Sequence, residues 1–136
     1  MQTNKPKPLS PHLQIYRWNI SSITSIMHRL TGTALYFAIL IMAWGIFYYT
    51  YNTSSTNSHN CNCLTTKIIY VVFCAAAVVI SFCLYYHFCN GIRHLFWDIG
   101  KGFELKTAKK TGYLVIFLSL ILTITTISIA IYLKFF

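Results

Sequence analysis

The chain has 136 residues, of which 56% are hydrophobic and only 10% charged, whereas a soluble domain usually carries about 25% charged residues. Eleven Lys and Arg against two Asp and Glu give a net charge of +9. The basic residues flank apolar runs, where they meet lipid headgroups, which argues against a nucleic-acid-binding protein. The sequence also lacks a glycine-rich phosphate loop and a pair of neighbouring acids, so we expect no soluble catalytic domain.

The first 20 residues form a polar, basic segment. Pro6, Pro8 and Pro11 disfavour a helix there, and we predict an extended arm over residues 1–20. No secretory signal is expected, because the first apolar run begins only after Arg29. Ser21 or Ser22 is a suitable N-cap, so we expect a short helix that leads into the membrane.

Three stretches contain no Asp, Glu, Lys or Arg, and each is long enough to cross a bilayer as a helix. They lie at residues 31–66, 68–92 and 111–133. We therefore predict an all-α membrane protein with three transmembrane helices. The whole chain, 1–136, would be a single membrane-anchor domain, with helices at about 22–51, 68–91 and 112–133.

The two connections differ in charge. The segment 52–67 is rich in Ser, Thr and Asn and carries only Lys67. The segment 92–111, which we predict to be a loop, carries five basic residues, and the N-terminal region carries four. By the positive-inside rule, the arm, the short helix and the 92–111 loop lie on the matrix or cytoplasmic side.

The five cysteines give no clear metal site. Cys74, Cys83 and Cys89 lie in the second apolar run and fit small core residues. Cys61 and Cys63 form a C-x-C pair in the first loop. Without a second pair this is a weak metal signal, and the role of the two thiols stays open.

Two groups of polar residues at membrane depth are candidates for chemistry. Ser25 and Arg29 are four residues apart and share a helix face. A hydroxyl and a guanidinium together can hold a carbonyl or carboxylate oxygen. Alternatively, Arg29 reaches out to lipid headgroups.

The second group consists of His87, Gly91 and His94, which share a face of the second span. A neutral histidine in an apolar helix is a suitable iron ligand, and a glycine one turn away would let a flat macrocycle approach. Alternatively, the histidine bridges two helices by a hydrogen bond. His87 and His94 lie roughly 10.5 Å apart along the axis and cannot bind one iron together. A second ligand would come from His28 or from another subunit.

Two motifs make the sequence resemble a known family. One is Pro8-Leu9-Ser10-Pro11-His12, continued by Ser25-Ile26-Met27-His28-Arg29-Leu30-Thr31-Gly32, and the other is His87-x3-Gly91-Ile92-Arg93-His94-Leu95-x-Trp97-Asp98-x-Gly100. In order and spacing they resemble the cytochrome b560 subunits of succinate dehydrogenase, the larger membrane anchor of respiratory complex II. The likeness extends from Pro8 through the third span.

The resemblance implies a function and partners. The chain would be a non-catalytic anchor of succinate:ubiquinone oxidoreductase, associated with the flavoprotein, the iron–sulfur subunit, the small anchor subunit and membrane lipid, and not with nucleic acid. The axial ligand of a b haem, shared with the small anchor, falls on His87. The ubiquinone-binding residues fall on Ser25 and Arg29, and His28 and Arg29 fall beside the haem propionates. His94 matches a recurrent position without a ligand role.

The resemblance also bears on location. Nuclear-encoded members carry a long presequence, whereas seven residues precede Pro8 here. The short N-terminal region favours a multi-pass protein of the mitochondrial inner membrane, encoded in the organelle. The residues of the second motif and the richness in Ile, Phe, Tyr, Asn and Lys favour the same location. A bacterial plasma membrane is the alternative. Alternative functions are a haem-free structural anchor and a self-sufficient b-type cytochrome with His28 and His87 both on iron.

Overall fold

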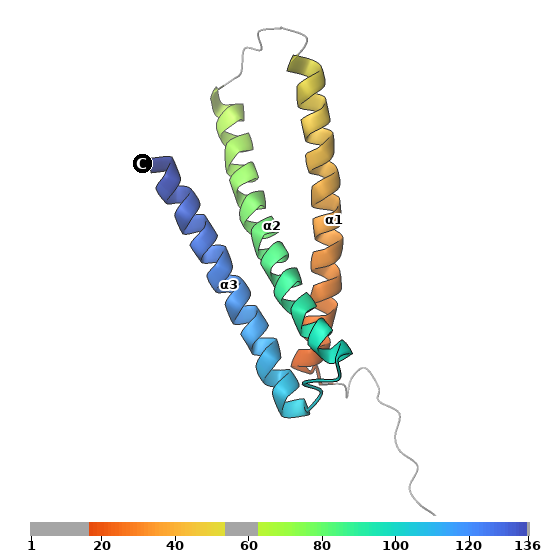
Figure 1. Cartoon of the computed structure of the whole chain (residues 1–136). Coiled ribbons are helices and arrows are strands. Elements are labelled where there is room, and N and C mark those ends of the chain that lie inside the picture. Colours follow the sequence, from red (N-terminus) through yellow and green to blue (C-terminus); the bar gives the residue numbers. More distant parts are fainter. Residues whose placement is uncertain (1–16, 54–62, 136) are drawn as a thin grey trace, which may run out of the picture.

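Three long helices make up the part of the chain that this computed structural model describes, residues 17–53 and 63–135 (Figure 1). They are α1 (Ile20–Thr53), α2 (Cys63–Asp98) and α3 (Leu105–Phe135). Each is long and apolar enough to cross a membrane. No strand occurs in the described stretches, and the predicted all-α membrane fold with three transmembrane helices is confirmed.

The helices extend beyond the predicted spans. α2 continues to Asp98 and α3 begins at Leu105, so most of the segment predicted as a basic loop over 92–111 is helical. The short helix expected near Ser21 is not separate, because α1 runs on from Ile20 without a break. Hydropathy marks only the part of a helix that lies in the hydrocarbon core. The helical hydrogen bonding continues beyond it into the polar interface, so the helices are longer than the apolar runs. Residues 1–16 of the predicted arm, and Cys61, lie outside the described residues.

Glycine ends α2. Gly100 has a φ of +81°, a left-handed conformation that glycine adopts without steric cost. The amide of Lys101 donates to the carbonyl of Phe96 at 3.0 Å, and the amide of Gly100 donates to that of Trp97 at 2.8 Å. These two bonds form a Schellman cap, which turns the chain sharply into the short link that leads to α3.

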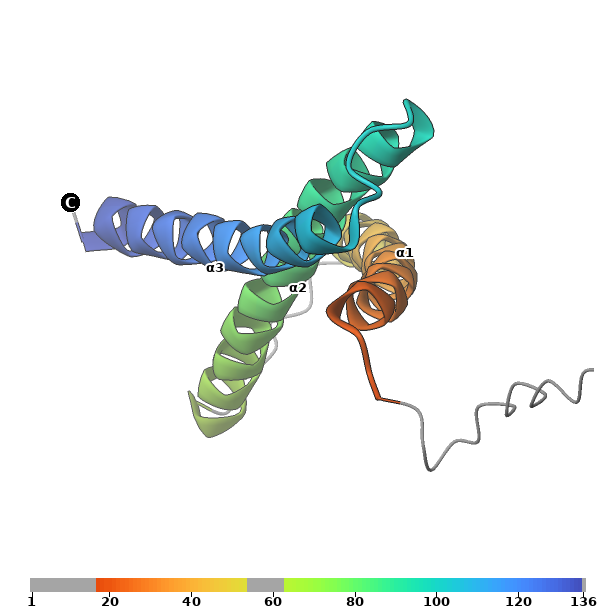
Figure 2. The same cartoon turned by 90° about the horizontal axis from the view of Figure 1, so that it is seen from below.

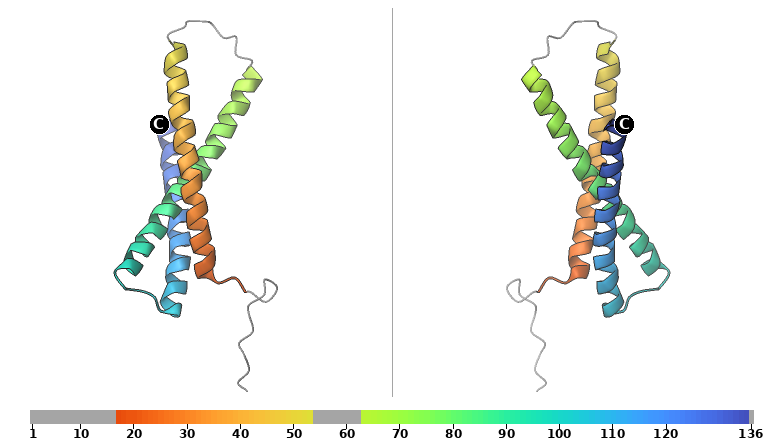
Figure 3. Two further views of the ribbon diagram at one scale, coloured as in Figure 1. Left: turned by 90° about the vertical axis from the view of Figure 1, so that its right-hand side faces the viewer. Right: turned by 90° about the vertical axis from the view of Figure 1, so that its left-hand side faces the viewer.

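The helices pack closely at one end of the molecule only. The start of α1 and the link between α2 and α3 lie together at this end, and α2 crosses the other two helices before the far halves diverge (Figures 1 and 3). The view along the molecule shows the three helices fanning apart (Figure 2). The buried apolar cluster of Tyr86, Cys89 and Val115 lies in the closely packed half. The start of α1 and the link between α2 and α3 thus lie at the same end of the molecule, while the side of the membrane that this end faces stays a prediction.

Polar side chains of α3 mostly bond to their own helix. The hydroxyls of Ser119, Thr123, Thr125 and Ser128 each donate to a carbonyl three or four residues back. Thr126 does the same and also bonds to Tyr85 of α2 at 2.7 Å. Bonds of this kind satisfy hydroxyls in an apolar helix, so these residues belong to the packing of α3.

Candidate haem and quinone site

Three histidines from two helices gather in the closely packed half of the bundle. The rings of His28 on α1 and His87 on α2 stack in parallel, with centroids 4.0 Å apart and an interplanar angle of 5°. His94, two turns after His87, lies 5.1 Å from the His28 ring and packs edge-on against Trp97. The structure therefore joins the first motif to the second through a direct contact.

The surroundings of His87 fix the position of its proton. Its Nδ1 lies 3.1 Å from the carbonyl oxygen of His28 and 3.5 Å from Oγ1 of Thr31. The Thr31 hydroxyl already donates to the carbonyls of Met27 and His28, so both neighbours of Nδ1 act as acceptors. Nδ1 must then carry the hydrogen, which leaves the lone pair of a neutral imidazole on Nε2. This tautomer and orientation are those of a metal-ligating histidine.

Gly32 makes room for the His87 ring. A Cβ atom at this position would lie 2.8 Å from Cε1 of His87, closer than any van der Waals contact. Only glycine lets α1 approach the imidazole at its observed place. Gly91 is less constrained, because a Cβ there would meet Cε1 of His28 at an ordinary 3.8 Å.

His28 carries an unsatisfied polar atom. Its Nδ1 is buried and has no hydrogen-bond partner among the described residues. A buried polar atom without a partner is costly, so a partner from beyond the described residues is expected. These features fit a haem. The unprotonated nitrogen of His87 could face the iron, and the unsatisfied nitrogen of His28 could face the polar edge of the haem, with a glycine beside them.

The same geometry argues against a haem held by this chain alone. To hold one iron together, both imidazoles would have to point an in-plane nitrogen lone pair at a common atom. The His28 and His87 rings instead lie face to face. His87 therefore fits as one ligand of a shared group.

Ser25 and Arg29 lie on the same part of α1, one turn apart and next to His28. Ser25 is partly buried and Arg29 is exposed. The first turns of α1, which carry both residues, lie at the end of the molecule where the link between α2 and α3 lies (Figure 1). The arrangement leaves the Arg29 charge accessible and keeps the serine hydroxyl within the packed region.

A second set of polar residues was missed in the sequence. Thr24 and Asn90 have no exposed surface, and Arg93 is 5% exposed. The sequence predicts Arg93 in the basic loop over 92–111, because basic residues next to an apolar run usually mark the end of a membrane span. The signal that was available is spacing, since Tyr86, Asn90 and Arg93 share one helix face, as His87, Gly91 and His94 do.

Comparison with known proteins identifies the family of the chain. A family model described as the succinate dehydrogenase/fumarate reductase transmembrane subunit matches residues 3–126. The succinate dehydrogenase cytochrome b556 subunit of Rickettsia felis is 46% identical over 117 residues, which cover 86% of this chain and 87% of that protein. The corresponding subunit of Paracoccus denitrificans is 33% identical over 123 residues, 89% of each chain.

A mitochondrial protein matches as well. The succinate dehydrogenase cytochrome b560 subunit of Sus scrofa is 37% identical over 116 residues, which cover 85% of this chain and 66% of that protein. These matches confirm the resemblance that the two sequence motifs indicated. The chain belongs to the family of succinate dehydrogenase and fumarate reductase transmembrane subunits.

Proposed function

We propose that this chain is the larger membrane anchor of a succinate:ubiquinone oxidoreductase, that it provides one axial ligand of a b haem, and that it forms part of the ubiquinone site. The observation that carries the proposal is the hydrogen bonding of His87, whose Nδ1 faces two acceptors. Family membership and the cytochrome b names of the relatives support it. The chain itself has no role in the oxidation of succinate.

His87 would hold the iron through Nε2, and the small anchor subunit would supply the other protein ligand. The bond from Nδ1 to the His28 carbonyl keeps the ring oriented and raises the basicity of the ligating nitrogen. The unsatisfied Nδ1 of His28 and the guanidinium of Arg29 would lie beside the propionates. The haem, when bound, supplies a one-electron redox centre, and the residues of this chain position it.

Ser25 and Arg29 would bind a carbonyl oxygen of ubiquinone. Both side chains are hydrogen-bond donors on one helix face. A quinone oxygen gains negative charge as it is reduced, and Arg29 stays positively charged throughout. The fixed charge and the hydroxyl therefore favour the reduced form over the oxidised one, which is how a positioned donor assists electron transfer.

The basic end of the molecule would face the extramembrane subunits. Lys101 in the link and Lys106, Lys109 and Lys110 in the first turns of α3 are exposed there. We propose that this surface receives the iron–sulfur and flavoprotein subunits, on the matrix side of the mitochondrial inner membrane. Relatives occur in bacteria and in mitochondria. Whether the coding sequence lies in an organellar or in a bacterial genome decides between the mitochondrial inner membrane and a bacterial plasma membrane.

Replacement of the serine tests the quinone assignment. In the purified complex, Ser25→Ala should lower ubiquinone reduction by succinate about tenfold or more, because one donor to the charged oxygen is lost. Reduction of a soluble dye by the flavoprotein subunit should be unchanged. Ser128→Ala is the matched control, since that hydroxyl is exposed and bonds only within α3. Equal quinone reduction in Ser25→Ala and wild type would reject the assignment.

A further inference from the structure

Thr24 of α1 is held by three side chains from one face of α2. Arg93 Nη1 donates to Thr24 Oγ1 at 2.9 Å. Asn90 Nδ2 and the hydroxyl of Tyr86 both donate to the Thr24 carbonyl, at 3.3 Å and 3.2 Å. Thr24 Oγ1 in turn donates to the carbonyl of Ser21 at 3.0 Å. The hydroxyl and the backbone carbonyl of Thr24 are thus both hydrogen-bonded, which fixes the first turns of α1 against α2.

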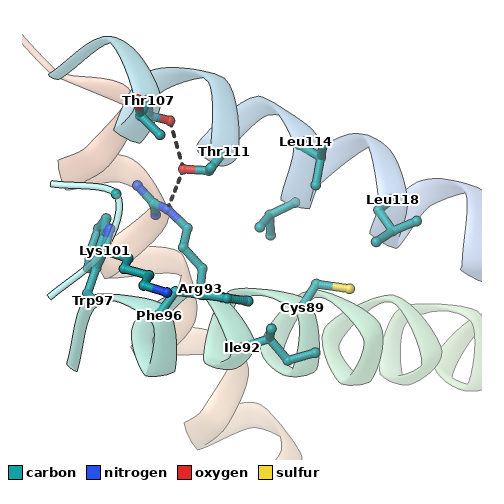
Figure 4. A pocket seen from close by; sticks show the side chains of 12 residues that line it. Cys89, Ile92, Arg93, Phe96, Trp97, Lys101, Thr107, Thr111, Leu114 and Leu118 are labelled. Carbon is teal, nitrogen blue, oxygen red and sulfur yellow. Dashed lines mark hydrogen bonds between the residues drawn. The ribbon is translucent and has the colours of Figure 1, made fainter. Parts of the chain in front are cut away.

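Arg93 also connects the other two helices. Its Nε donates to Thr111 Oγ1 at 3.1 Å, and Nη2 donates to the Ala108 carbonyl at 3.0 Å, both on α3. A further bond from Nη1 reaches Asn90 Oδ1 at 3.3 Å, and the guanidinium lies 4.1 Å from the centroid of the Trp97 ring. Figure 4 shows the side chain extending from α2 to Thr111 beside a cavity of about 390 Å³ between the two helices.

The Arg93 charge has no ionic partner within the described part of the chain. The sequence contains only two acids, Asp98 and Glu104, and both are exposed. The cavity beside Arg93 is lined mainly by apolar residues, and no acid lines it. A buried guanidinium in this setting depends on neutral acceptors, and each lost acceptor leaves a buried N–H unpaired. The positions of those acceptors are therefore strongly constrained.

We propose that Arg93 is a positioning residue for the quinone-binding pair. Thr24 directly precedes Ser25 in α1, and successive residues of a helix point about 100° apart. By holding Thr24, Arg93 fixes the rotation of α1 about its axis and with it the direction of the Ser25 hydroxyl and the Arg29 guanidinium. This role rests on the proposed assignment of Ser25 and Arg29 to ubiquinone. The contacts of Arg93 themselves do not depend on that assignment.

An isosteric pair of substitutions at Thr24 tests the role in the assembled complex. Thr24→Val removes the acceptor of Arg93 and keeps the shape, whereas Thr24→Ser keeps the hydroxyl. Thr24→Val should raise the KM for a soluble ubiquinone analogue about five- to tenfold, the effect of about one hydrogen bond, with a smaller change in kcat. Dye reduction and the haem bands should stay at wild-type level, and Thr24→Ser should behave as wild type.

Two further variants keep the test decisive if Thr24→Val assembles poorly. Arg93→Lys retains the charge but not the planar guanidinium whose nitrogens bond to all three helices. It should therefore also raise the KM for the ubiquinone analogue. Glu104→Gln removes an exposed charge from the same end of the molecule and should leave this KM unchanged. A parallel loss of haem, dye reduction and quinone reduction in the Thr24 and Arg93 variants would indicate general destabilisation and overturn the positioning role.

The Ser25→Ala variant separates the two proposals. If Ser25→Ala impairs quinone reduction while Thr24→Val and Arg93→Lys leave the KM unchanged, the quinone site stands and the positioning role is rejected. If Ser25→Ala has no effect either, ubiquinone does not bind at this pair, and both proposals fail.

Discussion

At the scale of single residues, the properties of His87 are set by backbone and side-chain groups of the facing helix. The carbonyl of His28 and the hydroxyl of Thr31 both accept from Nδ1 of His87. The tautomer therefore follows from contacts with residues that are 59 and 56 positions away in the sequence. The spacing of His87, Gly91 and His94 could indicate a ligand candidate, but not which nitrogen is available. That information comes only from the packing of α1 on α2.

Gly32 gives a direct test of this packing. Gly32→Ala places a Cβ 2.8 Å from Cε1 of His87 and must move the ring or the helix. We expect loss of most of the haem absorbance of the purified complex, while the subunits still assemble.

Gly45→Ala is the matched control. Gly45 lies in the same helix, and a Cβ there meets nothing within 4 Å. Its expected effect on stability is favourable and at most about 1 kcal/mol. If Gly32→Ala retained full haem absorbance, the close approach of α1 to His87 would not be needed for haem binding.

At the scale of helices, the sequence located the three spans because runs without charge mark the hydrocarbon core. It did not locate the helix ends. α2 carries Arg93 and Asp98 within its last turns, and α3 begins with basic residues, so charge alone suggested a loop. Arg93 is buried because acceptors from all three helices surround it, which no property of its sequence neighbours indicates.

The contact of α1 with α3 depends on a second glycine. A Cβ on Gly112 would lie 3.4 Å from Ile20 Cγ1 and 3.6 Å from Thr24 Cγ2, so alanine fits with little adjustment. Gly112→Leu would overfill the contact and lower stability by about 1–3 kcal/mol, which thermal unfolding of the complex in detergent would measure. Replacement of the exposed Tyr113 by leucine should be close to neutral. Equal melting temperatures for Gly112→Leu and Gly112→Ala would contradict the observed packing.

At the scale of the whole molecule, the chain leaves much of its apolar surface uncovered. None of the most apolar part of α2, and only 6% of that of α1, is buried within the chain. Lipid and the proposed partner subunits would cover these faces. The sequence could predict the three spans, because runs without charge mark them, while their orientation in the membrane stays a prediction. It could not predict the crossing of α2 over α1 and α3, which depends on small residues and on the polar contacts of Thr24.

The role of His87 is tested by the reduced-minus-oxidised optical spectrum of the purified, assembled complex, with wild type compared with His87→Ala. We predict that the b-type bands disappear in His87→Ala while all subunits remain associated, because one axial ligand is lost. His94→Gln, on the same face of α2, should keep the bands. An unchanged spectrum in assembled His87→Ala would mean that the haem is held elsewhere, and would contradict the proposed function of the site.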